Sequence, residues 1–503
     1  MPDGFQTTGP ATGNNDPGIR SRSPRRGFEA IREKARRRNR DSQIKTNGQT
    51  WAFFGALAAR VRSRAAFRPF CGAAILQLRY VFNWGEKSVA GFLLRLPVCL
   101  ILVCSLPLGS AESDNYFPPP DKDGGWRTLT DRGKIRTLAG MDLSRLDEAF
   151  EFEKETSQHG GLVVVRHGYL VYEKYFGNGN REAHPDMASI GKAFTSISCG
   201  IMLKEKHDQI PDGLETKVFT EKYLPEAFPL SDPSKADIKL GQLLSMSSGM
   251  HGDGGNPGMV NGVDQKLDPM PRPDPPQDQD TSALRAPMWT KPGEGYSYAS
   301  GSPHVASIVL RHLVGMEMQQ YIDEKLAKPL GFGPWGYAVH RNGTTLPHTP
   351  GGGSIALRAT DAVRLPYLIL HKGKWGSTQI VPAEYVAMCG KPSPYNPHSP
   401  MGLMFEQNAD GHVFGAPRDA FFKSGAGGSG IYIVPSLDLV LYKMAGNDAQ
   451  FNPDLTGLPL TYELNHSRDN WKPLPHDQFH DGPVGGDDGV RRLLEMVVAA
   501  VMQ

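Results

Sequence analysis

Short apolar runs on either side of a turn occur in two widely separated parts of the chain. Residues 161–172 are apolar except around His167-Gly168, and residues 431–440 are apolar except around Pro435-Ser436. Two apolar runs joined by a short turn are typical of an antiparallel hairpin. The pattern therefore predicts one hairpin centred near residue 167 and another near residue 435.

Helical spacing begins soon after the first hairpin. Phe194, Ile197 and Ile201 recur at intervals of three to four residues, and Pro185 and Asp186 precede them as helix-start residues. Such spacing places the apolar side chains on one face of a helix. The pattern predicts a helix whose first turn lies close to residue 189.

That first turn carries a candidate nucleophile and its base. Ser189 and Lys192 are three residues apart, so on a helix the Ser189 Oγ and the Lys192 Nζ share a face and can meet. A lysine acts as a base at neutral pH only when burial or a neighbouring cation lowers its pKa, and Lys423 is the candidate cation. Unpaired backbone N–H groups at the helix start would also favour negative charge on an acyl oxygen.

The S-x-x-K pattern alone is weak, because Ser42 and Lys45 form a second match inside an arginine-rich stretch. What distinguishes Ser189 is that two further motifs follow it in order, Tyr298-Ala299-Ser300 and Lys423-Ser424-Gly425. Together the three strings would surround one acyl group with a hydroxyl, two amines and a phenol.

These motifs resemble those of the serine β-lactamase and penicillin-binding-protein superfamily, which uses S-x-x-K and K-T-G. The class C-like branch of β-lactamase-related esterases and amidohydrolases is the most similar, because it carries a Y-x-N motif. Here Ser300 replaces the asparagine, and its hydroxyl can donate one hydrogen bond to a substrate carbonyl or to Lys192. The preference among substrates therefore stays open.

The resemblance extends over roughly residues 116–500. Residues 243–249 resemble the family's L-L-x-M-x-S-G helix end, and Gly351-Gly352-Gly353-Ser354 resembles its glycine-rich loop. The implied fold is α/β (α+β) and β-lactamase/transpeptidase-like. It has an antiparallel sheet of about five strands, from residues 160–175 and 412–446, flanked by helices, with a mostly helical insertion. A helix over 485–502 would pack on the sheet through Val490, Leu493, Leu494 and Val497.

The resemblance also implies the site and the reaction. The catalytic residues would be Ser189, Lys192 and Tyr298, and the substrate-binding residues would be Ser300, Lys423, Ser424, Gly425 and Ala426. The N–H groups of Ser189 and Ala426 would form the oxyanion hole. We expect an acyl-enzyme that hydrolyses an ester, amide or β-lactam, without metal or cofactor. A cell-wall D,D-carboxypeptidase and a non-catalytic binding protein of the same fold are the alternatives.

Other catalytic patterns are weaker. Residues 295–299 lie one substitution from a G-x-S-x-G elbow, but a turn precedes them where a buried strand is required. His476 and His480 lie near aspartates, yet no H-E-x-x-H string occurs, so a polar surface loop is the better interpretation. Cys199 and Cys389 lie in apolar helical patterns, which favours buried free thiols, although a disulfide between them is possible.

Length and composition describe a large protein with an ample core, since the chain has 503 residues, is 39% hydrophobic and carries a net charge of +2. Residues 20–46 are packed with arginine, and an arm that binds nucleic acid or a membrane is one interpretation. The apolar run Leu96 to Leu108, followed by Ala111, favours a different interpretation of the N-terminal region, in which this run belongs to a secretory signal peptide. We expect no nucleic-acid partner and no stable membrane span.

These features divide the chain into four parts. Residues 1–88 are expected to be a disordered basic extension, with translation starting near Val89, and residues 89–111 the signal peptide. A short anchor with a basic arm is the alternative. Residues 112–130 are expected to form an extended linker and residues 131–503 the hydrolase domain. Within that domain, residues 252–279 are rich in Gly, Pro and Asp, which predicts a long loop over the site.

Overall fold

The computed structural model describes residues 116–253, 256–268, 278–337, 340–341, 344–396, 401–451 and 487–502. The predicted basic extension, the signal peptide, His476 and His480 lie outside the described residues. Within the described part of the chain, no helix is long and apolar enough to cross a membrane.

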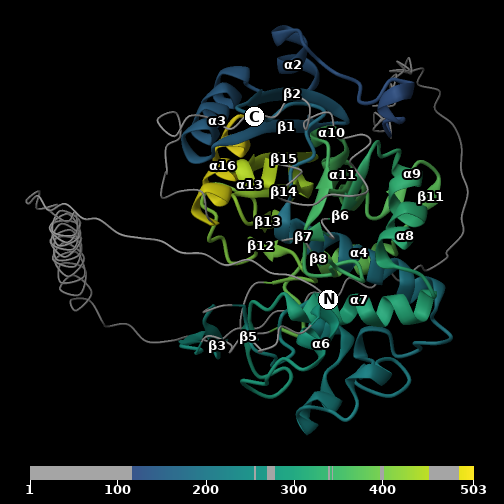
Figure 1. Cartoon of the computed structure of the whole chain (residues 1–503). Helices are drawn as coiled ribbons and strands as arrows, with labels where there is room; N and C mark the ends of the chain where they lie inside the picture. The colour runs from purple at the N-terminus through teal and green to yellow at the C-terminus, as the bar shows by residue number, and fades with distance from the viewer. Residues whose placement is uncertain are drawn as a thin grey trace, which may run out of the picture. The chain divides into compact units, whose positions relative to one another are not determined.

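A six-stranded antiparallel sheet supports the site, and its strands come from both ends of the described region (Figure 1). The strand order is β12-β13-β14-β15-β1-β2. The strands are β1 (His159–Arg166), β2 (Tyr169–Phe176), β12 (Glu406–Gln407), β13 (Phe421–Gly425), β14 (Ser429–Val434) and β15 (Leu439–Gly446). The β1–β2 and β14–β15 hairpins turn at His167-Gly168 and at residues 435–438, so both predicted hairpins are confirmed.

Helices cover both faces of this sheet because its central strands alternate their side chains between two cores. Leu162 and Val164 of β1 belong to one buried cluster, and Val163 and Val165 belong to the other. The helices α3 (Leu143–Thr156) and α16 (Asp487–Ala499) lie side by side over the first face (Figure 1). On the second face, α11 (Arg364–Leu370) contacts β14 and β15. The predicted C-terminal helix packs through the expected residues, Val490, Leu493, Leu494 and Val497, which are all buried.

A mostly helical insertion lies between the two halves of the sheet, as predicted. Its longer helices are α4 (Gly191–Glu205) and α7 (Gly301–Val314), which pack against each other. The shorter helices are α5 (Leu240–Leu244), α6 (Gln279–Leu284), α8 (Met318–Ile322), α9 (Lys328–Leu330), α10 (Ala359–Ala362) and α12 (Ala383–Cys389), with α2 (Arg132–Leu138) and α13 (Asp448–Phe451) outside the insertion. The remaining short strands are β6 (Trp335–Tyr337), β7 (His340–Arg341), β8 (Thr344–Thr345), β9 (Ile355–Leu357), β10 (Lys374–Trp375) and β11 (Thr378–Gln379).

The segment that was expected to be a long loop contains a hairpin instead. Strands β3 (Gly258–Val260) and β4 (Val263–Gln265) pair antiparallel, and β3 also pairs with β5 (Tyr296–Ser297). The connection is Asn261-Gly262, and both residues have positive φ, 52° and 74°. Asn-Gly is the preferred sequence of a two-residue hairpin turn, so this dipeptide was the local signal for the hairpin.

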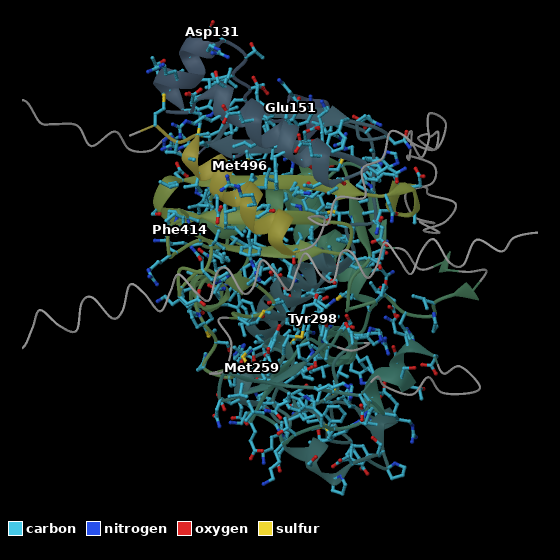
Figure 2. All side chains as sticks on the ribbon, turned by 90° about the vertical axis from the view of Figure 1, so that its left-hand side faces the viewer. Asp131, Glu151, Met259, Tyr298, Phe414 and Met496 are labelled. Atoms are coloured by element: carbon cyan, nitrogen blue, oxygen red, sulfur yellow. The ribbon has the colours of Figure 1, made fainter. Side chains whose placement is uncertain are left out.

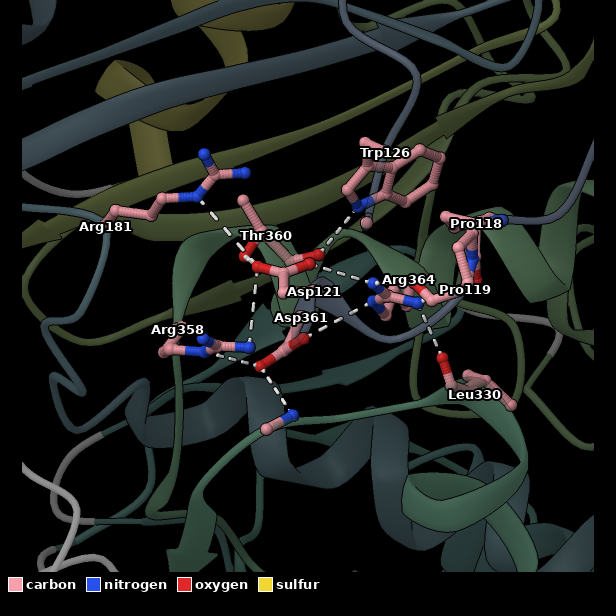
Figure 3. Close-up of polar contacts among 12 residues, drawn as sticks. Pro118, Pro119, Asp121, Trp126, Arg181, Leu330, Arg358, Thr360, Asp361 and Arg364 are labelled. Carbon is pink, nitrogen blue, oxygen red and sulfur yellow. Dashed lines mark hydrogen bonds and ion pairs between the residues drawn. The ribbon is translucent and has the colours of Figure 1, made fainter. Parts of the chain in front are cut away.

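The described part of the expected linker is packed against the domain. The buried guanidinium of Arg364 donates to the carbonyls of Pro118 and Pro119, at 3.0 and 2.8 Å, and pairs with Asp121 (Figure 3). The indole of Trp126 donates to the carbonyl of Thr360 at 2.9 Å. The lead into the domain is therefore bound to α10 and α11 through both its backbone and its side chains.

The two cysteines of this region, Cys199 and Cys389, are buried free thiols, and no disulfide joins them.

Candidate active site

Ser189 and Lys192 meet as the spacing predicted. Ser189 lies in a 3₁₀ turn, η2 (Ala188–Ile190), that leads directly into α4. The Lys192 Nζ lies 2.9 Å from the Ser189 Oγ, and it also donates to the carbonyl of Gly352 at 2.5 Å. The Lys192 side chain is 0% exposed. A buried amine is thus within hydrogen-bonding reach of a hydroxyl.

The glycine-rich loop holds this turn in place. Ala188 has a φ of 47°, a left-handed conformation that costs energy for a residue with a Cβ, and the Ser354 N–H donates to its carbonyl at 2.8 Å. A Cβ on Gly191 would lie 2.8 Å from the Cα of Gly353. The loop can approach the start of α4 only because both of these residues are glycine.

The surroundings of Lys192 favour its neutral form. Burial lowers the pKa of Lys192 below its ordinary value, and the charge of Lys423 lowers it further, whereas Tyr298 and Asp253 oppose the shift. The cation that the sequence suggested for this role is therefore close enough to act. The pKa of Lys192 is thus shifted in the direction that a lysine base requires.

Tyr298 lies between the two amines. Its ring centroid is 5.0 Å from the Lys192 Nζ and 5.3 Å from the Lys423 Nζ. Burial alone would raise the pKa of Tyr298, but Lys423, Lys192 and a hydrogen bond with Ser189 bring it below its ordinary value. Figure 2 shows Tyr298 on the side of the sheet away from Glu151 of α3 and Met496 of α16. The three residues expected to be catalytic are therefore brought together.

Lys423 and Ser424 lie on β13, and both bind a carboxylate that the sequence analysis did not identify. The Glu406 Oε1 accepts from the Lys423 Nζ at 2.7 Å, from the Ser424 Oγ at 2.8 Å and from the Ser424 N–H at 3.3 Å. Burial alone would raise the pKa of Glu406, but the charge of Lys423 and these hydrogen bonds lower it. Lys423 is 1% exposed, and Glu406 is 18% exposed.

Ser300 is also paired with a carboxylate. Its N–H donates to Asp253 Oδ1 at 2.8 Å and its hydroxyl to Asp253 Oδ2 at 2.5 Å. The hydroxyl therefore bonds to Asp253 and not to Lys192, which was one of its two expected partners. The Asp253 N–H donates in turn to the Tyr298 carbonyl at 2.8 Å, so Asp253 braces the backbone of the tyrosine motif.

Gly425 and Ala426 end the wall that β13 forms beside the nucleophile. A Cβ on Gly425 would lie within van der Waals overlap of the Met187 carbonyl, so β13 runs directly against the backbone that precedes Ser189. Ala426 is exposed at the turn between β13 and β14. The sequence-predicted site residues thus lie on η2, the first turn of α4, the segment that joins β5 to α7, β13 and the turn that follows β13.

Three residues of the site were missed by the sequence analysis: Gly352, Asp253 and Glu406. Gly352 belongs to a loop that was recognised, but a carbonyl has no sequence signal. Asp253 lies in the Gly- and Asp-rich stretch for which the sequence predicts a long loop, and this composition does not indicate a role for one particular aspartate. Glu406 has no local signal, because its partners come from the neighbouring strand. Among the described residues, no group of three or more His, Cys, Asp or Glu side chains is arranged to hold a metal ion.

The Beta-lactamase family model matches residues 150–457. A search of curated proteins found no match.

Solved structures similar to this chain include a class C beta-lactamase, with 13% identity and a TM-score of 0.49, over 74% of this chain and 98% of that one. A penicillin-binding protein homologue from Caulobacter crescentus has 14% identity and a TM-score of 0.46, over 71% and 97%. A family VIII carboxylesterase has 17% identity and a TM-score of 0.45, over 65% and 96%.

The family-model match covers more than half of the chain and contains every motif of the site, from Ser189 to Gly425. The antiparallel sheet, its flanking helices and the helical insertion complete the same fold. The resemblance read from the sequence is confirmed, and this protein belongs to the Beta-lactamase family and has its hydrolase fold.

Proposed function

We propose that this protein is a serine hydrolase that forms an acyl-enzyme on Ser189 and then releases the acid by hydrolysis. The contact between the Lys192 Nζ and the Ser189 Oγ, at 2.9 Å in a buried and cation-flanked setting, is the observation that carries the proposal. Membership of the Beta-lactamase family supports the same reaction class.

In acylation, neutral Lys192 takes the proton of Ser189 while the Oγ attacks the acyl carbonyl carbon. The carbonyl electrons move onto the oxygen, which the N–H groups of Ser189 and Ala426 stabilise. When the intermediate collapses, the C–O or C–N bond to the leaving group breaks. Tyr298 supplies a proton to that group and is reprotonated from Lys192.

In deacylation, water takes the place of the leaving group. Neutral Lys192 accepts one proton from the water, relayed through the hydroxyl of Tyr298, which passes its own proton to Lys192 as it takes that of the water, while the water oxygen attacks the acyl-enzyme. The bond to the Ser189 Oγ then breaks and the proton returns to the serine. The acid leaves, and the amine of Lys192 is neutral again for the next cycle.

The test compares Ser189→Ala with the wild type on p-nitrophenyl butyrate. We expect Ser189→Ala to lose at least about a thousandfold in kcat/KM, because it removes the nucleophile. Ser144→Ala, an exposed serine on α3, is the matched control and should retain activity. Undiminished turnover by Ser189→Ala would contradict the proposal.

Covalent labelling separates the alternatives. A fluorophosphonate should label the Ser189 peptide, as read by mass spectrometry. Stable trapping of a fluorescent penicillin on the same peptide would favour a D,D-peptidase. Absence of both labels together with absence of ester turnover would favour a binding protein that keeps the fold.

We also propose that the protein is secreted or periplasmic, because the run Leu96 to Leu108 and Ala111 have the pattern of a signal peptide. N-terminal sequencing of the mature protein tests this. A start just after Ala111 is expected, and recovery of the arginine-rich segment in the mature protein would contradict it.

A further inference from the structure

Lys423 and Ser424 are the groups on β13 that are suited to bind an anionic substrate, because an ammonium and a hydroxyl are natural donors to a carboxylate. In this protein both donate to Glu406 Oε1, at 2.7 and 2.8 Å, and the Ser424 N–H adds a third hydrogen bond at 3.3 Å. An internal carboxylate therefore holds the position where the carboxylate of a substrate would bind.

The charge balance around Tyr298 points the same way. The cation of Lys423 lies 5.3 Å from the Tyr298 ring centroid and is neutralised by Glu406. On the other side, Asp253 is bound to Ser300 and braces the Tyr298 carbonyl. Lys192 must be neutral to act as a base. None of these groups offers an unpaired positive charge to an anionic substrate. The carboxylates of Glu406 and Asp253 would repel such a substrate.

Burial makes this repulsion effective. Lys423 is 1% exposed and Glu406 is 18% exposed, so water screens their charges less than it would on an open surface. A substrate carboxylate that approached Ser424 would have to displace Glu406 or lie beside it. Either event leaves one carboxylate without its donors in a poorly hydrated place.

We propose that Glu406 fills the anion-binding position of this site and makes the enzyme select acyl substrates that are neutral or cationic where they meet Lys423 and Ser424. This inference rests on the proposed function of Ser189 and names its substrate class. Acyl compounds with a carboxylate at that position are disfavoured.

Three p-nitrophenyl esters of similar chain length test the selectivity in the wild type. They are the neutral hexanoate, the anionic adipate monoester, and the ester of pentanoic acid with a trimethylammonio group at the chain end. We expect kcat/KM for the adipate monoester to be at least about tenfold below that for the hexanoate, since the like charges meet at short range. The cationic ester should equal or exceed the hexanoate. Rates with Ser189→Ala are subtracted as background.

Glu406→Gln is the decisive variant, because it keeps the shape and an acceptor oxygen but removes the negative charge. We expect the hexanoate-to-adipate ratio of kcat/KM to fall by about tenfold or more. Glu151→Gln on α3 makes the same change in net charge away from the site and should leave the ratio unchanged (Figure 2). Asp253→Asn is a second variant that removes a carboxylate, and it should also lower the hexanoate-to-adipate ratio of kcat/KM.

The outcomes are distinct. Equal turnover of hexanoate and adipate monoester by the wild type, or an unchanged ratio in a folded Glu406→Gln, would overturn the inference while leaving the hydrolase function intact. If Glu406→Gln did not fold, the order of kcat/KM for the three esters with the wild type would still test the inference. Absence of turnover with all three esters would overturn the proposed function and this inference with it.

Discussion

Asp253 accepts both the backbone N–H and the hydroxyl of Ser300, so one carboxylate fixes the third residue of the Tyr298-Ala299-Ser300 motif. Hydrogen bonds to a charged acceptor contribute about 1.5–3 kcal/mol each. We expect Asp253→Ala to lower kcat/KM about tenfold or more, and Ser300→Ala to lower it less, because only the first change also releases the backbone. Steady-state kinetics on a neutral ester, with unfolding curves as a folding check, measures this. A larger loss in Ser300→Ala would contradict the bracing role of Asp253.

The pH dependence of kcat/KM reports the proton on Lys192. Burial and the charge of Lys423 lower the pKa of Lys192, so activity should rise with pH and level off well below the range of an ordinary lysine. Replacing Lys423 and Glu406 together, as Lys423→Met/Glu406→Gln, removes the neighbouring cation without leaving an unpaired buried charge. We expect the midpoint to move upward by less than about one pH unit, because the loss of the Glu406 charge offsets part of the loss of the Lys423 charge.

The control for this shift is Lys154→Met/Glu151→Gln, which makes the same pair of changes in an exposed ion pair on α3. Its pH profile should match that of the wild type. A midpoint that stayed in place in the site variant would mean that Lys423 does not tune the base.

Glu153 makes stability depend on pH. Its side chain is fully buried, Oε2 has no hydrogen-bond partner among the described residues, and burial raises its pKa to about 8 in spite of nearby Lys443. The folded state thus binds this proton more tightly than the unfolded chain, whose ordinary value is 4.5. The contribution to stability is complete below that value and is lost as the pH rises toward 8.

We expect the wild type to lose up to about 5 kcal/mol through Glu153 over this range, and Glu153→Gln to lose much less. Urea unfolding at about pH 5 and about pH 8.5 measures the difference between the two proteins. Glu155→Gln, an exposed glutamate on the same helix, should behave like the wild type. If the free energy of unfolding changed with pH equally in the wild type and in Glu153→Gln, Glu153 would not be the source of the pH dependence.

Asp361 anchors the arginines that hold the N-terminal lead. It accepts from Arg358 Nε at 2.9 Å and lies 3.3 Å from Arg364 Nε, and both carboxylate and Arg364 are fully buried (Figure 3). Asp361→Ala removes the buried carboxylate that both guanidinium groups share, so we expect a loss of about 3–5 kcal/mol in the free energy of unfolding. Glu151→Ala breaks an exposed pair and should cost less than about 1 kcal/mol. Urea unfolding of both variants makes the comparison.

Much of the fold was predictable because its signals are local. The two hairpins follow from apolar runs around His167-Gly168 and Pro435-Ser436, and the C-terminal helix follows from its apolar spacing. The meeting of Ser189 and Lys192 was equally local, since residues three apart share a helix face. The β3–β4 hairpin was missed although Asn261-Gly262 marked its turn, because the surrounding glycines and prolines outweighed that dipeptide.

Contacts between distant segments are the part that no local pattern contains. The motif order indicated that Tyr298 and Lys423 would lie near Ser189. Only the tertiary structure shows that Tyr298 lies close to two amines. It alone also shows that the Gly352 carbonyl accepts from Lys192 and that Asp253 accepts from Ser300. Glu406 is the clearest case. Its carboxylate meets Lys423 and Ser424 because β12 pairs with β13, and that pairing depends on the register of strands that nothing near residue 406 encodes. Reactive groups can be read from residue types and short spacings, whereas their charge balance is decided by which buried neighbours the tertiary structure brings within hydrogen-bonding distance.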